Sequence, residues 1–157
     1  MALVTAPARD VATLIAFVPG VPAPKGSMRY VGNGRMIEQV KASVPWRDRV
    51  NERIREAAES FEYTHYKTEA VEVSLRFIVP RPASAKRRLW PFTRGSGDVD
   101  KLSRNVLDAI SDTRKSPGVL RDDSCVVSLH ASKHYQSAKD PHIGVSIVIQ
   151  TARDEDA

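Results

Sequence analysis

Residues 97–127 read GDVDKLSRNVLDAISDTRKSPGVLRDDSCVV, and this stretch joins a helical pattern to the start of a strand pattern. In its first half, apolar residues recur at three- and four-residue intervals: Leu102, Val106, Ala109 and Ile110. This spacing predicts a helix over 100–111 with one buried face. The sequence KSPG at 115–118 then breaks the chain, and 125–135 reads as a strand.

Two pairs of carboxylates flank the predicted helix. Asp98 and Asp100 open it, and Asp122 and Asp123 come just before the strand. Carboxylate oxygens are the hard ligands that Mg²⁺ prefers, and an ion held by two or three of them can activate a water molecule in nucleases. Asp is also common at helix N-termini and in turns, so the alternative is capping and turn closure. We hypothesise that a single sheet edge brings the two pairs together.

Outside this stretch, the sequence predicts one more helix and three more strands. TLIAFV at 13–18 reads as a short buried strand, and VEVSLRFIV at 71–79 alternates strictly between apolar and polar positions. Apolar residues at three- and four-residue intervals predict a helix from about 42 to 61. The last strand, 143–151, follows 125–135 after a polar turn, and we expect the two to be antiparallel.

The order strand, helix, strand, helix, strand, strand predicts an α+β (mixed α/β) fold with one mixed sheet and two main helices. A length of 157 residues suits a single domain, residues 1–157. We expect 1–12 to be a loose leader and 152–157 (ARDEDA) an acidic tail.

Composition excludes several classes of protein. No apolar run is long enough to span a bilayer, and no basic region precedes the N-terminal apolar run, so we expect a cytoplasmic protein without a membrane partner. The single cysteine, Cys125, cannot form an internal disulfide. His130 and His134 are the only neighbouring histidines, and on a strand they lie too far apart to share a zinc ion easily.

The formal net charge of +5 suggests an anionic partner, and its distribution is more informative. Residues 80–97, called here the basic loop, contain no acid, and their prolines and glycines argue against regular structure. Their basic residues are Arg81, Lys86, Arg87, Arg88 and Arg94. Trp90 and Phe92 lie among them, and either stack on opened DNA or pack in the core or against a second subunit. A basic segment beside an acidic cluster is typical of a phosphodiesterase.

GDVDKLSRNVLDAI, a short loop and RDDSCVV together resemble the RusA family of Holliday junction resolvases. That family has a DxDNLxK element, an LDAL-like helix and a DD pair that leads into a strand. The matching positions here are Asp98, Asp100, Leu102, residues 107–110, Asp122 and Asp123. PGVPAPKGSMR at 19–29 resembles the family's proline- and glycine-rich start. Two positions depart from the pattern, since the family's asparagine is Lys101 here and its lysine is Arg104.

The resemblance implies a Mg²⁺-dependent homodimer, with Mn²⁺ as an alternative cation, that nicks four-way junctions and other branched DNA symmetrically. Such enzymes are often phage-encoded, which would place this one in the host cytoplasm. By resemblance, Asp98, Asp100 and Asp123 coordinate the metal and are catalytic, with Asp122 auxiliary. Either Arg104 or Lys101 stabilises the developing charge. The expected DNA-binding residues are Lys25, Arg29, Arg81, Lys86, Arg87, Arg88 and Arg94.

Two other functions fit parts of the sequence. One is a non-catalytic module that binds structured DNA, descended from a nuclease and altered at Lys101 and Arg104. The other takes DVD at 98–100 as the metal site of a glycosyltransferase. The second is disfavoured, because the chain is short for a nucleotide-binding domain and has no glycine-rich phosphate loop.

Overall fold

The computed structural model describes residues 13–26, 28–38, 41–60, 69–85 and 87–152, apart from the side chains of Met28, Arg29, Ile37 and Glu38. The expected leader at 1–12, the acidic tail from 153 on, and Lys86 of the basic loop lie outside the described residues.

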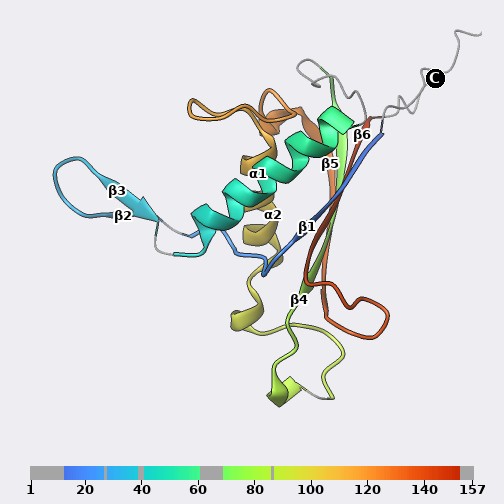
Figure 1. The fold of residues 1–157 in the computed structure, drawn as a ribbon. Helices are drawn as coiled ribbons and strands as arrows, with labels where there is room; N and C mark the ends of the chain where they lie inside the picture. The colour runs from blue at the N-terminus through green and yellow to red at the C-terminus, as the bar shows by residue number, and fades with distance from the viewer. Residues whose placement is uncertain (1–12, 27, 39–40, 61–68, 86, 153–157) are drawn as a thin grey trace, which may run out of the picture.

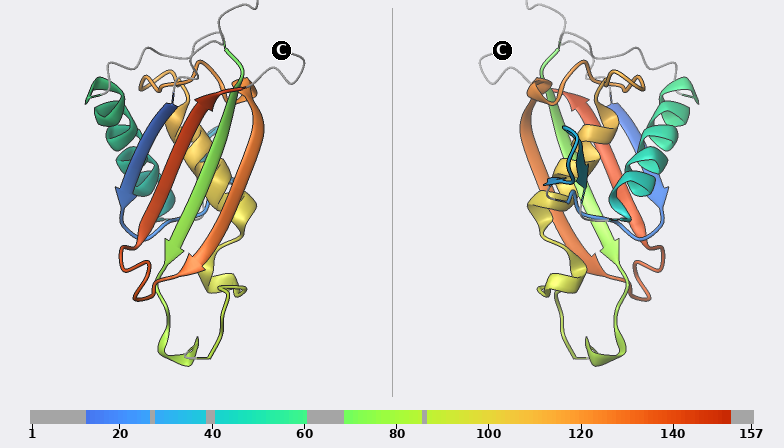
Figure 2. Two further views of the ribbon diagram at one scale, coloured as in Figure 1. Left: turned by 90° about the vertical axis from the view of Figure 1, so that its right-hand side faces the viewer. Right: turned by 90° about the vertical axis from the view of Figure 1, so that its left-hand side faces the viewer.

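Four strands form one mixed sheet in the order β1-β6-β4-β5 (Figures 1 and 2). The strands are β1 (Thr13–Pro19), β4 (Val71–Val79), β5 (Val126–Tyr135) and β6 (Gly144–Thr151). β4 pairs in parallel with β5 and antiparallel with β6, and β6 pairs antiparallel with β1. β4 has the bounds that its alternation predicted, because each second side chain along it faces the core.

Two helices, α1 (Ser43–Ser60) and α2 (Val99–Ile110), lie on the same face of the sheet (Figure 1). Their apolar stripes and the inner face of the sheet form one buried core, which includes Val50, Ile54, Leu75, Phe77, Val106 and Ile147. Full burial of one such side chain stabilises the fold by about 1.5–3 kcal/mol. The fold class predicted from the sequence is confirmed: a small α+β domain with one mixed four-stranded sheet and two helices.

The last two strands are antiparallel in direction, as predicted, but they are not neighbours in the sheet. β5 and β6 run in opposite directions, but β4 lies between them, so residues 136–143 cross over the end of β4. β6 enters between two strands and approaches β1 closely. At Gly144, φ is 156° and a Cβ atom would lie 2.2 Å from the carbonyl oxygen of Val18, so only glycine fits.

A second, two-stranded sheet was not expected from the sequence. β2 (Met28–Tyr30) and β3 (Met36–Glu38) pair antiparallel and extend away from the main sheet (Figure 1). The turn between them places Gly32, Asn33 and Gly34 at positive φ values of 91°, 53° and 69°. An Asn-Gly turn of this kind is a strong hairpin signal, which the prolines upstream had outweighed.

The basic loop extends beyond the end of β4 (Figure 2), and its described residues form two short 3₁₀ turns, η1 (Ala83–Ala85) and η2 (Arg94–Ser96). Trp90 is 52% exposed and Phe92 is 74% exposed, so core packing is excluded for both side chains. A third turn, η3 (Asp123–Cys125), precedes β5. None of the helices within the described residues has the length and apolar character needed to cross a membrane.

Candidate functional site

The first acidic pair lies at the N-terminus of α2. Asp98 occupies the N-cap position, but its side chain makes no capping hydrogen bond; only its carbonyl oxygen accepts the N–H of Leu102, at 2.9 Å. The Asp98 side chain is 60% exposed and lies 3.6 Å from Nζ of Lys101. Asp100, in the first turn of the helix, is exposed as well. Neither carboxylate is buried, and the helix N-terminus favours their negative charge.

Lys133 on β5 holds the backbone just before this pair. Its ammonium donates to the carbonyl oxygen of Gly97 at 2.7 Å and to Oγ of Ser96 at 3.0 Å. Lys133 pairs in register with Phe77, so it occupies a position on the helix-covered side of the sheet, where the sequence pattern predicts an apolar residue. The sequence analysis did not select it, although a lysine in such a register position is an unusual feature.

The second acidic pair lies directly before β5. The backbone N–H of Ser124 donates to the Asp122 carboxylate at 2.8 Å and holds the pKa of Asp122 below its usual range. The pKa of Asp123 is raised, mainly by a hydrogen bond with Asp122 and to a smaller extent by burial. Asp122 therefore does close a turn, as the alternative interpretation held, and its presence makes the neighbouring Asp123 carboxyl harder to ionise.

Asp108, on the third turn of α2, belongs to the surroundings of the second pair. Its Oδ2 atom lies 2.5 Å from Nζ of Lys25, and both charges act on Asp123. The backbone N–H of Lys25 also donates to the carbonyl oxygen of Lys101, at 3.1 Å, which fixes Lys25 against α2. Lys25, expected to contact DNA, is thus held in an ion pair. Arg104, four residues before Asp108 on α2, is exposed, and Asp108 pairs with Lys25.

A buried asparagine on α2 fixes the positions of these elements relative to one another. The side chain of Asn105, which is fully buried, donates to the carbonyl oxygens of Ala23 at 3.0 Å and Ser43 at 3.2 Å. Its own oxygen accepts from Nε of Arg47 at 2.8 Å. These bonds join α2 to the start of α1 and to the segment that carries Lys25, so the polar residues on α2 stand on a rigid support.

The two acidic pairs lie at opposite ends of α2. The helix has 12 residues, a rise of about 18 Å. Asp98 lies beside the far part of β5, next to Lys133, whereas Asp123 precedes the start of that strand. Across the described residues, no three His, Cys, Asp or Glu side chains are placed to hold one metal ion. The hypothesis that one sheet edge brings both pairs together is not met within a single chain.

Each pair alone still has chemistry that suits Mg²⁺. The ion commonly takes one or two carboxylates from the protein and completes its octahedral shell with water and substrate phosphate. Asp98 and Asp100 provide two carboxylates at one exposed point, so they fit this pattern. Asp122 and Asp123 fit it less well, because Asp122 already accepts the N–H of Ser124 and the pKa of Asp123 is raised. The set of four does not fit as the ligands of one ion in one chain.

The basic residues of the loop differ in role. Nη1 of Arg81 donates to the carbonyl oxygens of Ala85 at 2.9 Å and Arg88 at 2.8 Å, so Arg81 holds the base of the loop together. Arg88 lies 5.1 Å from the ring centre of Phe92. Arg87 and Arg94 are exposed and suit phosphate contacts. Two more of the expected DNA-binding residues, Lys86 in the loop and Arg29 on β2, have side chains outside the described part of the structure.

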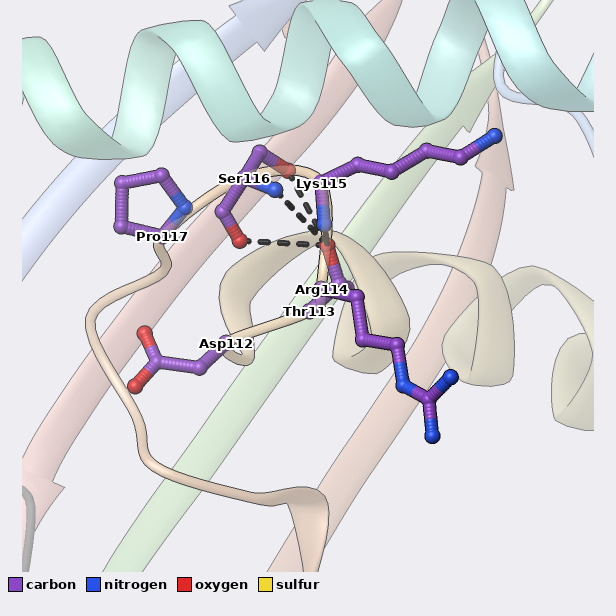
Figure 3. A pocket seen from close by; sticks show the side chains of 6 residues that line it. All are labelled: Asp112, Thr113, Arg114, Lys115, Ser116 and Pro117. Carbon is purple, nitrogen blue, oxygen red and sulfur yellow. Dashed lines mark hydrogen bonds between the residues drawn. The ribbon is translucent and has the colours of Figure 1, made fainter.

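Figure 3 shows a hollow of about 320 Å³ that is formed by a single loop, residues 112–117. The hydroxyl of Thr113 accepts the backbone N–H groups of Lys115 at 3.2 Å and Ser116 at 3.0 Å. The hollow is therefore the concave side of a local turn, and its polar groups are largely used in forming that turn. We assign it no part in the site.

Comparison with known proteins agrees with this geometry. The family model described as Endodeoxyribonuclease RusA matches residues 19–148. A search of curated proteins finds no match. The matched range contains both acidic pairs, all of α2, the basic loop and Lys133. The exposed carboxylates, the cationic loop beside them and the extent of the match lead to one conclusion: this chain belongs to the RusA family of endodeoxyribonucleases.

Proposed function

We propose that this endodeoxyribonuclease is Mg²⁺-dependent, with Mn²⁺ as an alternative cation, and resolves four-way junctions and other branched DNA by paired symmetric nicks. One observation carries the proposal. Two exposed carboxylates, Asp98 and Asp100, follow directly after a loop whose charged residues are all basic. Cations there neutralise the phosphates that flank the cut, while carboxylates hold a metal at the reacting phosphate.

We assign different roles to the residues around Asp98. Bound Mg²⁺ would activate a water molecule and neutralise charge on the phosphate. Lys101 lies 3.6 Å from Asp98, which places its ammonium beside the first pair, and we assign it to the charge that develops on the phosphate. Arg104, one turn further along α2 and exposed, binds a neighbouring phosphate. Lys133 fixes the backbone that leads into both carboxylates.

We also propose that the protein acts as a homodimer. β5 is an edge strand and exposes two apolar side chains, Val127 at 62% and Leu129 at 44%. A two-fold dimer suits a four-way junction that is nicked at two equivalent points. The separation of the acidic pairs adds a second reason, because a metal ion that needs carboxylates from both pairs must take them from two protomers.

The first experiment compares cleavage of a synthetic four-way junction with that of linear duplex of the same sequence, in Mg²⁺, in Mn²⁺ and in EDTA. We expect paired nicks on the junction only, and only with a metal. Binding without nicks would instead support the non-catalytic DNA-binding module. Neither binding nor nicks would overturn the assignment of junctions as the substrate.

A second experiment tests whether two protomers share each site. The variants Asp100→Asn and Asp123→Asn are prepared separately and then mixed under conditions that exchange subunits. If a site takes Asp100 from one protomer and Asp123 from its partner, a mixed dimer contains one intact site, and we expect nicks in one strand. If each protomer forms its own site, the mixture stays as inactive as its components. Unmixed variants at the same total concentration are the control.

A further inference from the structure

A cavity of about 320 Å³ lies at the base of the basic loop, where β4 and β5 end. It is a different space from the surface that carries the acidic pairs. Its walls come from three parts of the chain: the segment after β1, the two ends of the basic loop, and the end of β5. The residues that characterise the walls are Val21, Pro22, Pro80, Pro82, Gly95 and Tyr135. The cavity therefore offers flat, apolar surfaces.

Four polar residues also line these walls, namely Arg81, Thr93, Ser96 and Tyr135, and Tyr135 is the most informative of them. The residue is 4% exposed, and the guanidinium of Arg81 covers its ring at 4.5 Å. Within the described part of the chain, its buried hydroxyl has no hydrogen-bond partner. Leaving a buried hydroxyl unpaired is costly, so such groups in folded proteins call for an explanation. The hydroxyl is closed off from solvent, so a bound molecule with a donor or acceptor on its edge would supply the missing partner after a small shift of the Tyr135 side chain.

The charges around the cavity indicate the chemical class of the bound molecule. Arg94, next to Gly95 in the wall, is exposed, and no acid occurs between 80 and 97. Nucleic acid bound along this loop brings its bases close to the cavity. A phosphate is a poor occupant, because the walls are mainly proline and aliphatic, and Nη1 of Arg81 already donates to two carbonyl oxygens.

We infer that the cavity receives one unstacked nucleobase of the DNA held by the basic loop, an inference that rests on the proposed function. The size suits a small flat ligand, since pockets for such molecules begin near 300 Å³ and are mostly apolar with a few polar groups. Proteins that take a base out of the stack hold its faces between apolar or aromatic side chains and its edge by hydrogen bonds. Here the prolines meet the faces, and the Tyr135 hydroxyl meets the edge.

The first test fills the cavity. A Cβ atom at Gly95 would meet nothing within 4 Å, and the backbone there is not in the left-handed region, so Gly95→Leu places a side chain in the space without backbone strain. We expect this variant to bind a four-way junction and a single-stranded oligonucleotide about tenfold more weakly than wild type, the scale of one lost base contact. Binding to linear duplex, whose bases stay stacked, is unchanged.

Changes in the DNA provide the matched control. With 2-aminopurine at the crossover, wild type raises its fluorescence by unstacking the base, and Gly95→Leu does not. With an abasic nucleotide at the same position, wild type and Gly95→Leu should bind equally well, because neither protein then has a base to place in the cavity. A tenfold difference that persisted on abasic DNA would mean that the leucine acts by distorting the loop, and would overturn the inference.

Tyr135→Phe is the second variant, and it separates binding from folding. The hydroxyl has no partner among the described residues, so its removal leaves the melting temperature unchanged or higher. We expect binding to the junction and to the single strand to fall severalfold all the same. If both variants bind single-stranded DNA as wild type does, the nucleobase inference fails. If wild type neither binds nor nicks the junction, the proposed function fails, and the single-strand comparison still decides the inference.

Discussion

The two acidic pairs have the same residue type but different surroundings. Asp98 and Asp100 are exposed, and Asp98 makes no side-chain capping bond, while Lys133 fixes the backbone before them. Asp122 instead accepts the N–H of Ser124, and Asp123 is hydrogen-bonded to Asp122. Two carboxylates without such bonds are available to a cation, whereas Asp122 already accepts a hydrogen bond and Asp123 is harder to ionise. We therefore propose the first pair as the primary metal-binding one.

The largest effect should come from the first pair itself. Asp100→Asn keeps the shape of the side chain and removes its charge, so junction cleavage in Mg²⁺ should fall more than ~100-fold, beyond the loss typical of residues that only support a metal ligand. Junction binding should persist or strengthen, because one charge that repels DNA is gone. Cleavage rates and gel-shift affinities measured on the same junction give both quantities. If the variant cleaved at near the wild-type rate, the first acidic pair would have no catalytic role, and the contrast between the two pairs would not concern catalysis.

The support of the first pair should give the next largest effect. Lys133→Met keeps much of the side-chain length and leaves the carbonyl of Gly97 without its ammonium donor. We expect unfolding to become easier by about 1–3 kcal/mol, the cost of an unsatisfied buried acceptor. Cleavage should also slow while binding to duplex DNA stays the same, since Asp98 loses its fixed position. Lys139→Met, an exposed lysine just beyond the same strand, is the control.

Most of the fold could be predicted from the sequence because its elements have clear periodicity. The strand at 71–79 has the predicted bounds, and the predicted helix at 100–111 is α2 within a residue at each end. Periodicity identifies a strand but not its neighbours, so the position of β4 between β5 and β6 could not be predicted. β2 and β3, with three residues each, are too short to show any period.

The site was predictable only where a motif marks it. The four acids were selected because they occur in pairs beside element ends, but their separation depends on the helix between them. Lys133 and Gly97 are 36 residues apart in the chain, and Lys25 and Asp108 are 83 apart. Contacts at that range leave no local pattern, so the supporting roles of Lys133 and Lys25 came only from the structure.

The ion pair beside the second acidic pair should have a smaller effect than Lys133. Lys25 and Asp108 are partly exposed, at 32% and 26%, so solvent weakens their attraction. Lys25→Met should cost about 1 kcal/mol in the free energy of unfolding, because it leaves Asp108 and Asp123 to repel each other. In an Asp108→Asn background the same change should cost less, which a double-mutant cycle in urea measures. Equal costs in both backgrounds would show that Lys25 acts through packing alone, and Lys115→Met provides an exposed control.

The smallest effect concerns the second pair, whose two carboxyl groups have pKa values shifted in opposite directions. The pKa of Asp123 is raised in the folded protein, so the folded state binds the proton more tightly, and stability is lost as pH rises through that pKa. Asn cannot ionise, so Asp123→Asn should be more stable than wild type at neutral pH by roughly a few tenths of a kcal/mol. This advantage should vanish at about pH 3, where the carboxyl is protonated in both states. Asp122→Asn should show the opposite sign, because the pKa of Asp122 is lowered and its stabilisation is present at neutral pH and lost in acid. Urea unfolding of the three proteins at both pH values measures these differences, and equal signs for the two variants would contradict the opposite pKa shifts.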